Sequence, residues 1–429
     1  MSQHLTPVIA NDDLDVHTAR RLDELIGLVR RFRGKYEQSL RHVTYIYYSN
    51  GVVAPTADDS VALFRHFGGL RQSLPWANLG NWPTPVDQLA DLSAHIGGAD
   101  IWVKREDASS SVYGGNKVRT LEAIMGEARA CGADYIWATG AYGSNHAVAT
   151  VLHAGAAGLN SGVALFPQPR SIPARENLSA MLSARPDLVN IPNVIGLPFV
   201  MSRLRKRGRK RGQKHYVMPP GAASPAGAFG AMSAAIELAE QVEAGDCPAP
   251  RQIVVAAGST CTSAGILAGL HTAAHLGIGF GKNGAPLPRV NAVRVTPWPV
   301  TSPQRIAWLA YKTAQRLDRL TDRRVDIPYK ALRGSLHVVS DDFGAGYGRV
   351  TARGVRAADA FRHMGGPPLD IVYSAKSGAA LLDLARATTG PILFWATKSS
   401  APLPSARRPD MAGVPRQVTR WLGDRALLD

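Results

Sequence analysis

A lysine at the junction of a glycine turn and a helix is the residue of this sequence best suited to covalent chemistry. Lys117 follows Gly114-Gly115-Asn116, lies after a strand-like segment at 101–107 and opens a helix-like stretch at 118–129. A partly buried lysine loses its charge readily, and its neutral amine can attack a carbonyl group to form a Schiff base. The alternative is a surface lysine on a turn, which a single motif does not exclude.

Two further loops rich in glycine and hydroxyl groups each follow a strand-like segment. Residues 140–146 follow a strand expected at 135–140, and residues 258–265 follow one expected at 253–257. In α/β proteins, ligands bind where strand ends lead into helix N-termini. The second loop is the better phosphate site, because its glycines allow close backbone approach and a helix start favours an anion.

The loop at 258–265 does not match the common nucleotide motifs. No Gly-Lys-Ser/Thr follows it, so it is not a P-loop, and it lacks the spacing of the dinucleotide fingerprint. A phosphate-bearing cofactor without a nucleotide, together with a lysine suited to a Schiff base, indicates pyridoxal phosphate.

Several clusters occur in one order along most of the chain, from about Thr84 to Thr397. They are 103–107, 114–117, 144–146, 258–260 with 264–265, 346–348, 369–376 and Thr397. In this order they resemble the pyridoxal-phosphate enzymes of the 1-aminocyclopropane-1-carboxylate deaminase and D-cysteine desulfhydrase family, which have the tryptophan-synthase-β-like fold (fold type II). The resemblance implies an α/β protein with two open, twisted parallel-sheet domains and pyridoxal 5'-phosphate between them.

The resemblance implies four catalytic residues: Lys117, Ser144, Tyr347 and Tyr373. Lys117 would hold the cofactor and move protons at the Cα atom of the substrate. Ser144 matches a hydroxyl that contacts the substrate carboxylate or, in the deaminase, acts as the attacking group, although Ser144 is also a good helix N-cap. The two tyrosines match phenols that flank the substrate, although tyrosines are also common in half-buried core positions.

The resemblance also implies a set of cofactor-binding residues. Asn145 would lie beside the ring hydroxyl, whereas His146 is expected to be structural. The loop at 258–262 would hold the phosphate. The full expected set is Lys117, Asn145, Gly258, Ser259, Thr260, Cys261, Thr262, Ser374 and Thr397.

Ser374 separates the two branches of the family. The deaminase branch has a glutamate beside the pyridine nitrogen at this position, and the desulfhydrase branch has a hydroxyl residue. Thr397 matches a second hydroxyl near the same nitrogen. A hydroxyl cannot keep the nitrogen protonated, so the ring withdraws electrons less strongly and a good leaving group on Cβ becomes important. This favours α,β-elimination over opening of a cyclopropane ring.

Several positions around the substrate depart from the family pattern. Lys398-Ser399 replaces a glycine pair, Thr260-Cys261 stands where small glycines are usual, Ser263 where histidine is frequent, and Gly143 where glutamine is common. These departures leave the substrate open. Lys398 either pairs with an acid group of the substrate or faces solvent.

The sequence therefore predicts a lyase that converts a small amino acid to a 2-oxo acid and ammonia, as a D-cysteine desulfhydrase does. A β-replacement synthase or a 1-aminocyclopropane-1-carboxylate deaminase would use the same residues. A scaffold that binds polyanions is the non-enzymatic alternative, and Lys117 argues against it.

Composition fits an intracellular enzyme. The 429 residues are 45% hydrophobic and 19% charged, enough for two domains with full cores. The three cysteines, Cys131, Cys247 and Cys261, have neither metal-ligand nor disulfide-framework spacing. The first residues do not resemble a signal peptide, and no apolar run reaches the roughly 18 residues of a membrane helix. We expect no metal site, no membrane role, a cytoplasmic location and a homodimer.

Half of the formal net charge of +16 lies in one run, 203–214, which has eight basic residues and no acid. Such blocks are usually solvated, and some bind polyanions. No aromatic residue interleaves with these charges, so nucleic-acid binding is not expected. We interpret the run as a dispensable surface insertion.

Three regions are expected along the chain. Residues 1–75 form a mainly helical N-terminal extension, periodic at 14–32. Residues 76–120 and 231–429 form the large cofactor-binding domain, in which the basic amphipathic stretch 304–324 is interpreted as an insertion. Residues 121–230 form the small domain, because strand-like and helix-like segments alternate there as in a parallel sheet.

Overall fold

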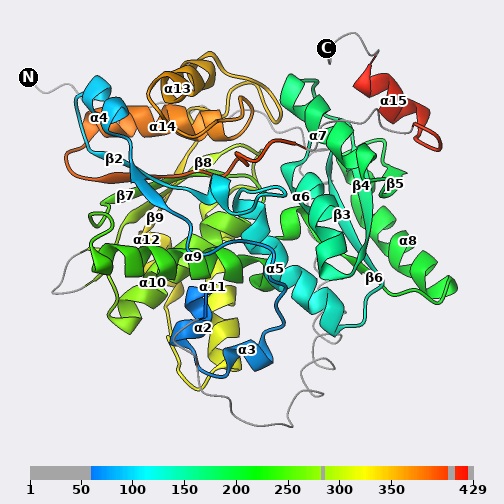
Figure 1. The fold of residues 1–429 in the computed structure, drawn as a ribbon, viewed down its shortest axis with the longest axis horizontal. Helices are drawn as coiled ribbons and strands as arrows, with labels where there is room; N and C mark the ends of the chain where they lie inside the picture. Colours follow the sequence, from blue (N-terminus) through cyan, green and yellow to red (C-terminus); the bar gives the residue numbers. More distant parts are fainter. Residues whose placement is uncertain (1–58, 282–285, 404–410, 424–429) are drawn as a thin grey trace, which may run out of the picture. The chain divides into compact units, whose positions relative to one another are not determined.

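The computed structural model describes residues 59–281, 286–403 and 411–423, so the periodic segment at 14–32 lies outside the described residues. Two sheets run through this part, one with the order β1-β2-β10-β7-β8-β9 and one with the order β5-β4-β3-β6 (Figure 1). All pairings are parallel except that of β1 with β2. The predicted α/β fold with two parallel sheets is confirmed.

The strands of the larger sheet are β1 (Val86–Gln88), β2 (Ile101–Lys104), β7 (Gln252–Ala257), β8 (Arg289–Arg294), β9 (Leu336–Val339) and β10 (Ile392–Trp395). The strands of the smaller sheet are β3 (Tyr135–Ala141), β4 (Asn160–Phe166), β5 (Asp187–Asn190) and β6 (His215–Val217). All four strands of the smaller sheet lie between residues 121 and 230, the range predicted for the small domain. The division into domains itself stays a prediction.

The helices alternate with these strands. In chain order they are α2 (Ala62–His66), α3 (Leu70–Ser73), α4 (Ala90–Ile96), α5 (Asn116–Ala130), α6 (Asn145–Ala154), α7 (Ile172–Ser183), α8 (Leu197–Lys210), α9 (Pro225–Ala244), α10 (Cys261–Leu276), α11 (Pro303–Leu320), α12 (Tyr329–Gly334), α13 (Ala352–His363), α14 (Ser374–Ala387) and α15 (Arg416–Leu422). Short 3-10 turns lie at Glu106–Ala108, Gly155–Ala157, Val194–Gly196 and Pro220–Ala222.

Side chains of the larger sheet alternate between two cores. Ile253 and Val255 of β7 pack with α9, α10 and α11, whereas Val254 between them packs with α4, α13 and α14. Both faces are therefore covered, and the central strands β7 and β10 are nearly continuous apolar runs, as is typical of parallel strands buried on two faces.

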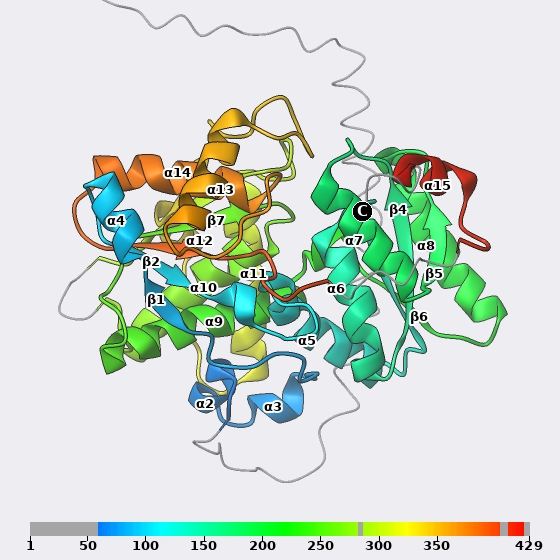
Figure 2. The same ribbon diagram turned by 45° about the horizontal axis from the view of Figure 1, so that its top comes forward.

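The smaller sheet is covered in the same way. Ile136 of β3 faces the core made by α5, α6 and α7, and the next residue, Trp137, faces α8 on the other side. Helix α5 contacts α9 beside the larger sheet and α6 beside the smaller one (Figure 2). The helix that begins with Asn116-Lys117 thus contacts helices of both sheets.

The basic run differs from the expected surface insertion. Residues 203–210 are the last turns of α8, the crossover helix between β5 and β6. Leu204 is 3% exposed and packs with Trp137, and a Cβ on Gly208 would lie 2.7 Å from the His215 ring. The charges lie on the outer face of a helix whose inner face covers the sheet, so deletion of the run would expose the core.

We expect this helix to tolerate loss of its charges but not of its inner face. Leu204→Ala should cost about 2–4 kcal/mol, because it leaves a cavity against the sheet. Replacement of the exposed Arg203, Lys206, Arg207 and Lys210 by glutamine should change the free energy of unfolding by less than about 1 kcal/mol. Urea denaturation measures the free energy of unfolding of both variants. The reverse order of effects would contradict this placement of α8.

Two other segments that were interpreted as additions also pack into the core. The end of the N-terminal extension forms α2 and α3, and the backbone N–H of Leu63 donates to Ser233 Oγ on α9 at 3.1 Å. The amphipathic stretch at 304–324 forms α11, whose Ile306 and Leu317 are fully buried. None of the helices in the described ranges is both long and apolar enough to cross a membrane.

Candidate active site

The loops after β2 and β10 meet around the start of α5. The backbone N–H of Asn116 donates to the carbonyl of Thr397 at 3.4 Å, and that of Gly114 donates to Ser399 Oγ at 2.9 Å. Gly115 has φ +88°, and a Cβ there would lie 2.6 Å from the Thr397 carbonyl oxygen. Only glycine fits, so the turn that presents Lys117 depends on it.

Lys117 is the second residue of α5 and its side chain is half-buried. Burial lowers the pKa of its amine, since a charged ammonium loses hydration there. The side chain makes no hydrogen bond or ion pair with the described residues. A lowered pKa and the lack of a partner both favour the neutral amine, which is the form that attacks a carbonyl.

The start of α10 presents several polar groups that lack partners. The hydroxyls of Thr260 and Ser263 are buried and have no hydrogen-bond partner, and Thr260 has φ +75°. Thr262 Oγ1 accepts from Asn116 Nδ2 at 2.7 Å, so its own hydrogen is free to be donated. With the free N–H groups of a 16-residue helix, these hydroxyls fit a phosphate group.

The other predicted residues of this loop contribute differently. Ser259 Oγ donates to the Gly221 carbonyl at 3.3 Å. Cys261 is buried, and burial raises the pKa of its thiol to about 11, so it stays neutral. A Cβ on Gly258 would lie 3.6 Å from Val295, an ordinary contact. The phosphate would therefore rest on backbone N–H groups and on Thr260, Thr262 and Ser263, of which Ser263 was not predicted.

We expect the hydroxyls of this helix start to contribute measurably to cofactor affinity. Replacing Thr262 with valine and Ser263 with alanine together should raise the Kd for pyridoxal phosphate by roughly 10- to 100-fold, since each loses a hydrogen bond to a charged group. Fluorescence titration of the apoprotein measures this. Ser302→Ala, a helix cap on α11, serves as a matched control. An unchanged Kd in the double variant would place the phosphate elsewhere.

Asn145 begins α6, and two neighbours fix its amide. Its Oδ1 accepts from the Tyr113 hydroxyl at 3.0 Å and from Asn177 Nδ2 at 2.7 Å. Because Asn145 Oδ1 accepts both bonds, Asn145 Nδ2 remains free to donate. A donor is what the predicted position beside the cofactor's ring hydroxyl requires. Ser144 is the N-cap, since its Oγ accepts from Ala147 N at 3.3 Å, which leaves its own hydrogen free.

His146 is buried and neither ring nitrogen has a partner within the described residues. Burial, with the positive charge of Lys117, lowers its pKa to about 3. His146 is therefore neutral near neutral pH and lies close to the lysine, in agreement with a structural role.

Tyr347 and Tyr373 form a phenol pair. The Tyr373 hydroxyl donates to that of Tyr347 at 2.7 Å, and the ring centroids lie 5.9 Å apart. Burial raises both pKa values, and Asp370 adds to each. The phenols therefore keep their protons near neutral pH. Tyr113 influences the pKa of Tyr373, which places this pair near the residue that holds Asn145.

Ser374 lies next to Tyr373, but its hydroxyl is engaged. Ser374 Oγ donates to Asp370 Oδ2 at 3.1 Å and accepts from Asp370 N at 2.8 Å. Asp370 in turn accepts three backbone N–H groups from 372–374. The hydroxyl of Thr397 makes no hydrogen bond within the described residues. Of the two hydroxyls predicted beside the ring nitrogen, Thr397 is the one with its hydrogen free.

Sequence reasoning missed Tyr113, Asn177 and Asp370 as members of this region. Asn177 lies on α7, 32 residues after Asn145, and no local pattern connects them. Tyr113 directly precedes the glycine pair, so its position was the one available signal.

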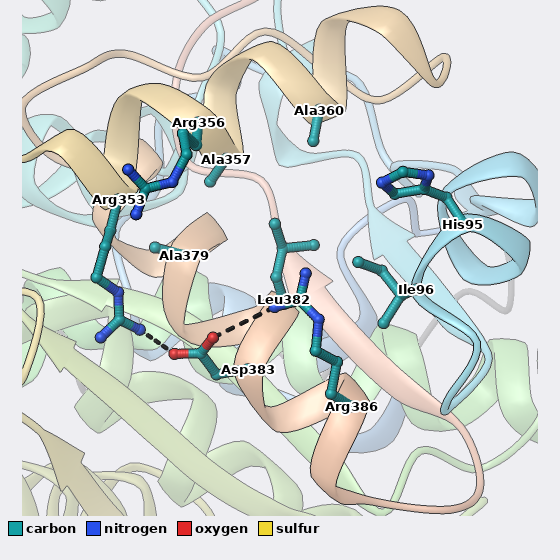
Figure 3. A pocket seen from close by; sticks show the side chains of 10 residues that line it. All are labelled: His95, Ile96, Arg353, Arg356, Ala357, Ala360, Ala379, Leu382, Asp383 and Arg386. Carbon is teal, nitrogen blue, oxygen red and sulfur yellow. Dashed lines mark hydrogen bonds and ion pairs between the residues drawn. The ribbon is translucent and has the colours of Figure 1, made fainter.

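A cavity of about 240 Å³ lies away from these residues, between α4, α13 and α14 (Figure 3). Arg353 and Arg386 both contact Asp383 in its wall, the second at 3.4 Å. Its lining is His95, Ile96, Arg353, Arg356, Ala357, Ala360, Ala379, Leu382, Asp383 and Arg386. None of the predicted site residues lines it.

Comparisons with known proteins identify the family of the chain. A nocardicin C-9' epimerase from Nocardia uniformis subsp. tsuyamanensis is 34% identical over 76% of this chain and 94% of its own length. A D-cysteine desulfhydrase from Salmonella schwarzengrund is 31% identical over 73% of this chain and 90% of its own length. The crystal structure of a homologue of 1-aminocyclopropane-1-carboxylate deaminase has a TM-score of 0.65 and 28% identity, covering 79% of this chain and 95% of that one.

The family model described as pyridoxal-phosphate dependent enzyme matches residues 77–395. The predicted resemblance, the enzymatic character and the cofactor are therefore confirmed, whereas the roles of the individual site residues stay predictions. With a match over most of the chain and a site whose lysine and free hydroxyls fit the cofactor, this protein belongs to the family of pyridoxal-phosphate-dependent enzymes.

Proposed function

We propose that the protein is a lyase that removes a β-substituent and the amino group from a small amino acid. With a substituent X on Cβ, the substrate and one water give HX, ammonia and a 2-oxo acid. Pyridoxal phosphate, when bound, withdraws electrons from the Cα atom of the amino acid. The chain itself must bind the substrate, move the proton at Cα and assist the departure of X.

The residues around Lys117 support these roles. Burial lowers the pKa of its amine, which favours the neutral form that can take the proton from Cα. Ser144, fixed at a helix start with its hydrogen free, can donate to the substrate carboxylate. The Tyr347–Tyr373 pair keeps its protons, so a phenol can donate one to the departing group.

The observation that favours elimination is the arrangement of Ser374 and Asp370. Because these two are bonded to each other, the group left for the ring nitrogen is the neutral hydroxyl of Thr397. A hydroxyl does not keep the ring nitrogen protonated, so the cofactor ring withdraws electrons less strongly. The reaction then depends on a good leaving group at Cβ, which favours elimination over opening of a cyclopropane ring. We expect 1-aminocyclopropane-1-carboxylate to react slowly at most. A β-replacement synthase would share these residues and differ in holding a second substrate.

Epimerisation at Cα is a second candidate, favoured by the relative whose name is an epimerase. It needs one group to remove the Cα proton and another to return a proton to the opposite face. Lys117 and the phenol pair are two such groups, so the same site could serve either reaction.

Incubation of the holoenzyme in deuterated water with both enantiomers of β-chloroalanine and of alanine separates the candidates. We expect 2-oxo acid from β-chloroalanine, measured enzymatically, and little inversion of alanine, measured by chiral chromatography. Inversion faster than elimination would instead support an epimerase. If added sulfide reacts with the β-chloroalanine-derived intermediate to give a new amino acid in place of the 2-oxo acid, the result would support β-replacement. Faster turnover of 1-aminocyclopropane-1-carboxylate than of β-chloroalanine would support a deaminase.

We also propose a cytoplasmic homodimer without a nucleic-acid partner. Trp298 and Trp308 are 62% and 43% exposed, which supports an apolar contact with another copy. Light scattering measures the mass in solution, and a monomer would contradict this proposal. The polyanion-binding scaffold has less support, because the basic residues of α8 belong to a helix that covers the sheet.

A further inference from the structure

Lys398 occupies a fixed position at the edge of the candidate active site. Thr397 before it accepts from Asn116 N, and Ser399 after it accepts from Gly114 N. Ser399 is 6% exposed. Because both neighbours are bonded to the turn that presents Lys117, the Cα atom of Lys398 is held directly beside that turn.

The side chain of Lys398 lies over residues of the same site. Its Nζ is 5.9 Å from the centre of the Tyr113 ring, and the Tyr113 hydroxyl donates to Asn145 at 3.0 Å. The side chain is half-buried. The ammonium group is thus on the side of the loop where Asn145 and the start of α6 lie.

Lys398 differs from most of the buried and half-buried lysines because its Nζ has no oxygen acceptor among the described residues. In the described ranges the buried or half-buried lysines are Lys104, Lys117, Lys312, Lys376 and Lys398. Three of them donate a hydrogen bond from Nζ to an oxygen atom. Lys104 donates to Glu237 at 2.6 Å, Lys312 to Gln315 at 3.0 Å and Lys376 to the Phe343 carbonyl at 2.7 Å. Lys117 and Lys398 have no such acceptor among the described residues.

The acids of the neighbouring loops are already engaged. Both oxygens of Asp107 accept from Arg105 at 2.9 Å, and Asp370 accepts the N–H groups that follow it. A half-buried ammonium without an acceptor is unfavourable unless a ligand supplies one. For Lys117 the cofactor would account for this state, whereas none of the described residues supplies an oxygen acceptor to Lys398.

We propose that Lys398 binds a second acid group on the substrate, so that the enzyme prefers an amino acid whose side chain carries a carboxylate. This rests on the proposed function, in which an amino acid binds beside Lys117. The carboxylate would supply the missing acceptor of Lys398, while Ser144 remains for the α-carboxylate. A substrate with a neutral side chain would leave the ammonium unpaired.

A matched pair of ligands tests this with the holoenzyme: S-carboxymethylcysteine and its neutral amide analogue S-carbamoylmethylcysteine, each as both enantiomers. Titration of the cofactor's visible spectrum measures affinity independently of turnover, and pyruvate release measures kcat/KM. The wild type should prefer the acid by roughly 10- to 100-fold. Lys398→Met should remove the preference and Lys398→Arg should retain most of it. Lys330→Met, which removes an exposed lysine on α12, should leave it unchanged.

Any other pattern of ligand affinities overturns the proposal. Equal weakening of both ligands in Lys398→Met would mean that Lys398 binds the α-carboxylate, and an unchanged preference would mean that it faces solvent. A wild type that binds the two ligands equally, or binds neither, also contradicts the proposal. If the acid is preferred in the spectral titration but no pyruvate forms, the proposed elimination is wrong and the inference about Lys398 stands.

Discussion

Replacement of Lys117 by alanine should reduce kcat/KM by roughly 10⁴-fold, because it removes both the covalent attachment point and the group that moves the Cα proton. Lys117→Arg should be as inactive, since a guanidinium does not lose its charge. Both variants should stay folded, because the side chain makes no hydrogen bond within the described residues. Steady-state kinetics on the best β-substituted amino acid, with circular dichroism, measures both points.

A small amine supplies the control for this variant. Added methylamine can replace the missing side-chain amine, so it should restore part of the activity of Lys117→Ala but none of that of Lys117→Arg. The Lys376→Met variant, which removes a different buried lysine, should not respond to the amine. A Lys117→Ala enzyme that retains more than about one tenth of wild-type activity would contradict a catalytic role.

The second large effect concerns a buried network beneath the same turn. Glu237 of α9 accepts from Lys104 at 2.6 Å and from Arg119 at 2.8 Å, and all three are almost fully buried. Glu237→Ala leaves two buried cations without this partner. Loss of one partner of a buried ion pair costs about 3–5 kcal/mol. We expect that loss in urea denaturation at neutral pH, whereas Glu176→Ala, at an exposed glutamate on α7, should change little.

The same carboxylate gives the network a pH dependence. Burial alone would raise the pKa of Glu237, but Arg119 and Lys104 outweigh it and lower the pKa from 4.5 to about 2. The folded pKa lies below the unfolded one, so this stability is fully present above pH 4.5 and is lost as the pH falls towards 2. Glu237→Gln should flatten the loss of stability over this window. An equally steep loss in that variant would assign the acid sensitivity to other groups.

Features that depend on local chain chemistry could be predicted from the sequence. The expected strands at 135–140 and 253–257 coincide with β3 and β7, whereas β2 ends at Lys104, within the expected 101–107. Helices α5 and α10 begin within the predicted glycine loops, at Asn116 and Cys261. A turn, a cap or an apolar strand is specified by a few adjacent residues. The lysine turn and the phosphate loop could therefore be found without the structure.

Features that depend on long-range contacts could not. Asn145 and Asn177 are brought together by the packing of α6 against α7, and Tyr113 reaches them from the loop before α5, which no local pattern specifies. The bond between Ser374 and Asp370 spans only four residues, yet it depends on how the start of α14 closes on the preceding loop, which the residue types alone do not specify. The run at 203–214 was interpreted from its charge alone, although Leu197, Leu204 and Gly208 recur on one helical face and pack inward.

Borohydride reduction of the holoenzyme followed by peptide mapping tests whether the cofactor is joined to Lys117. Reduction fixes the cofactor to the amine that holds it, and mass spectrometry then locates the added group. We expect a pyridoxyl group on the peptide that contains Lys117, formed in wild type and absent from Lys117→Ala. A pyridoxyl group on Lys376, Lys398 or any other lysine of the wild-type enzyme, or none at all, would contradict it.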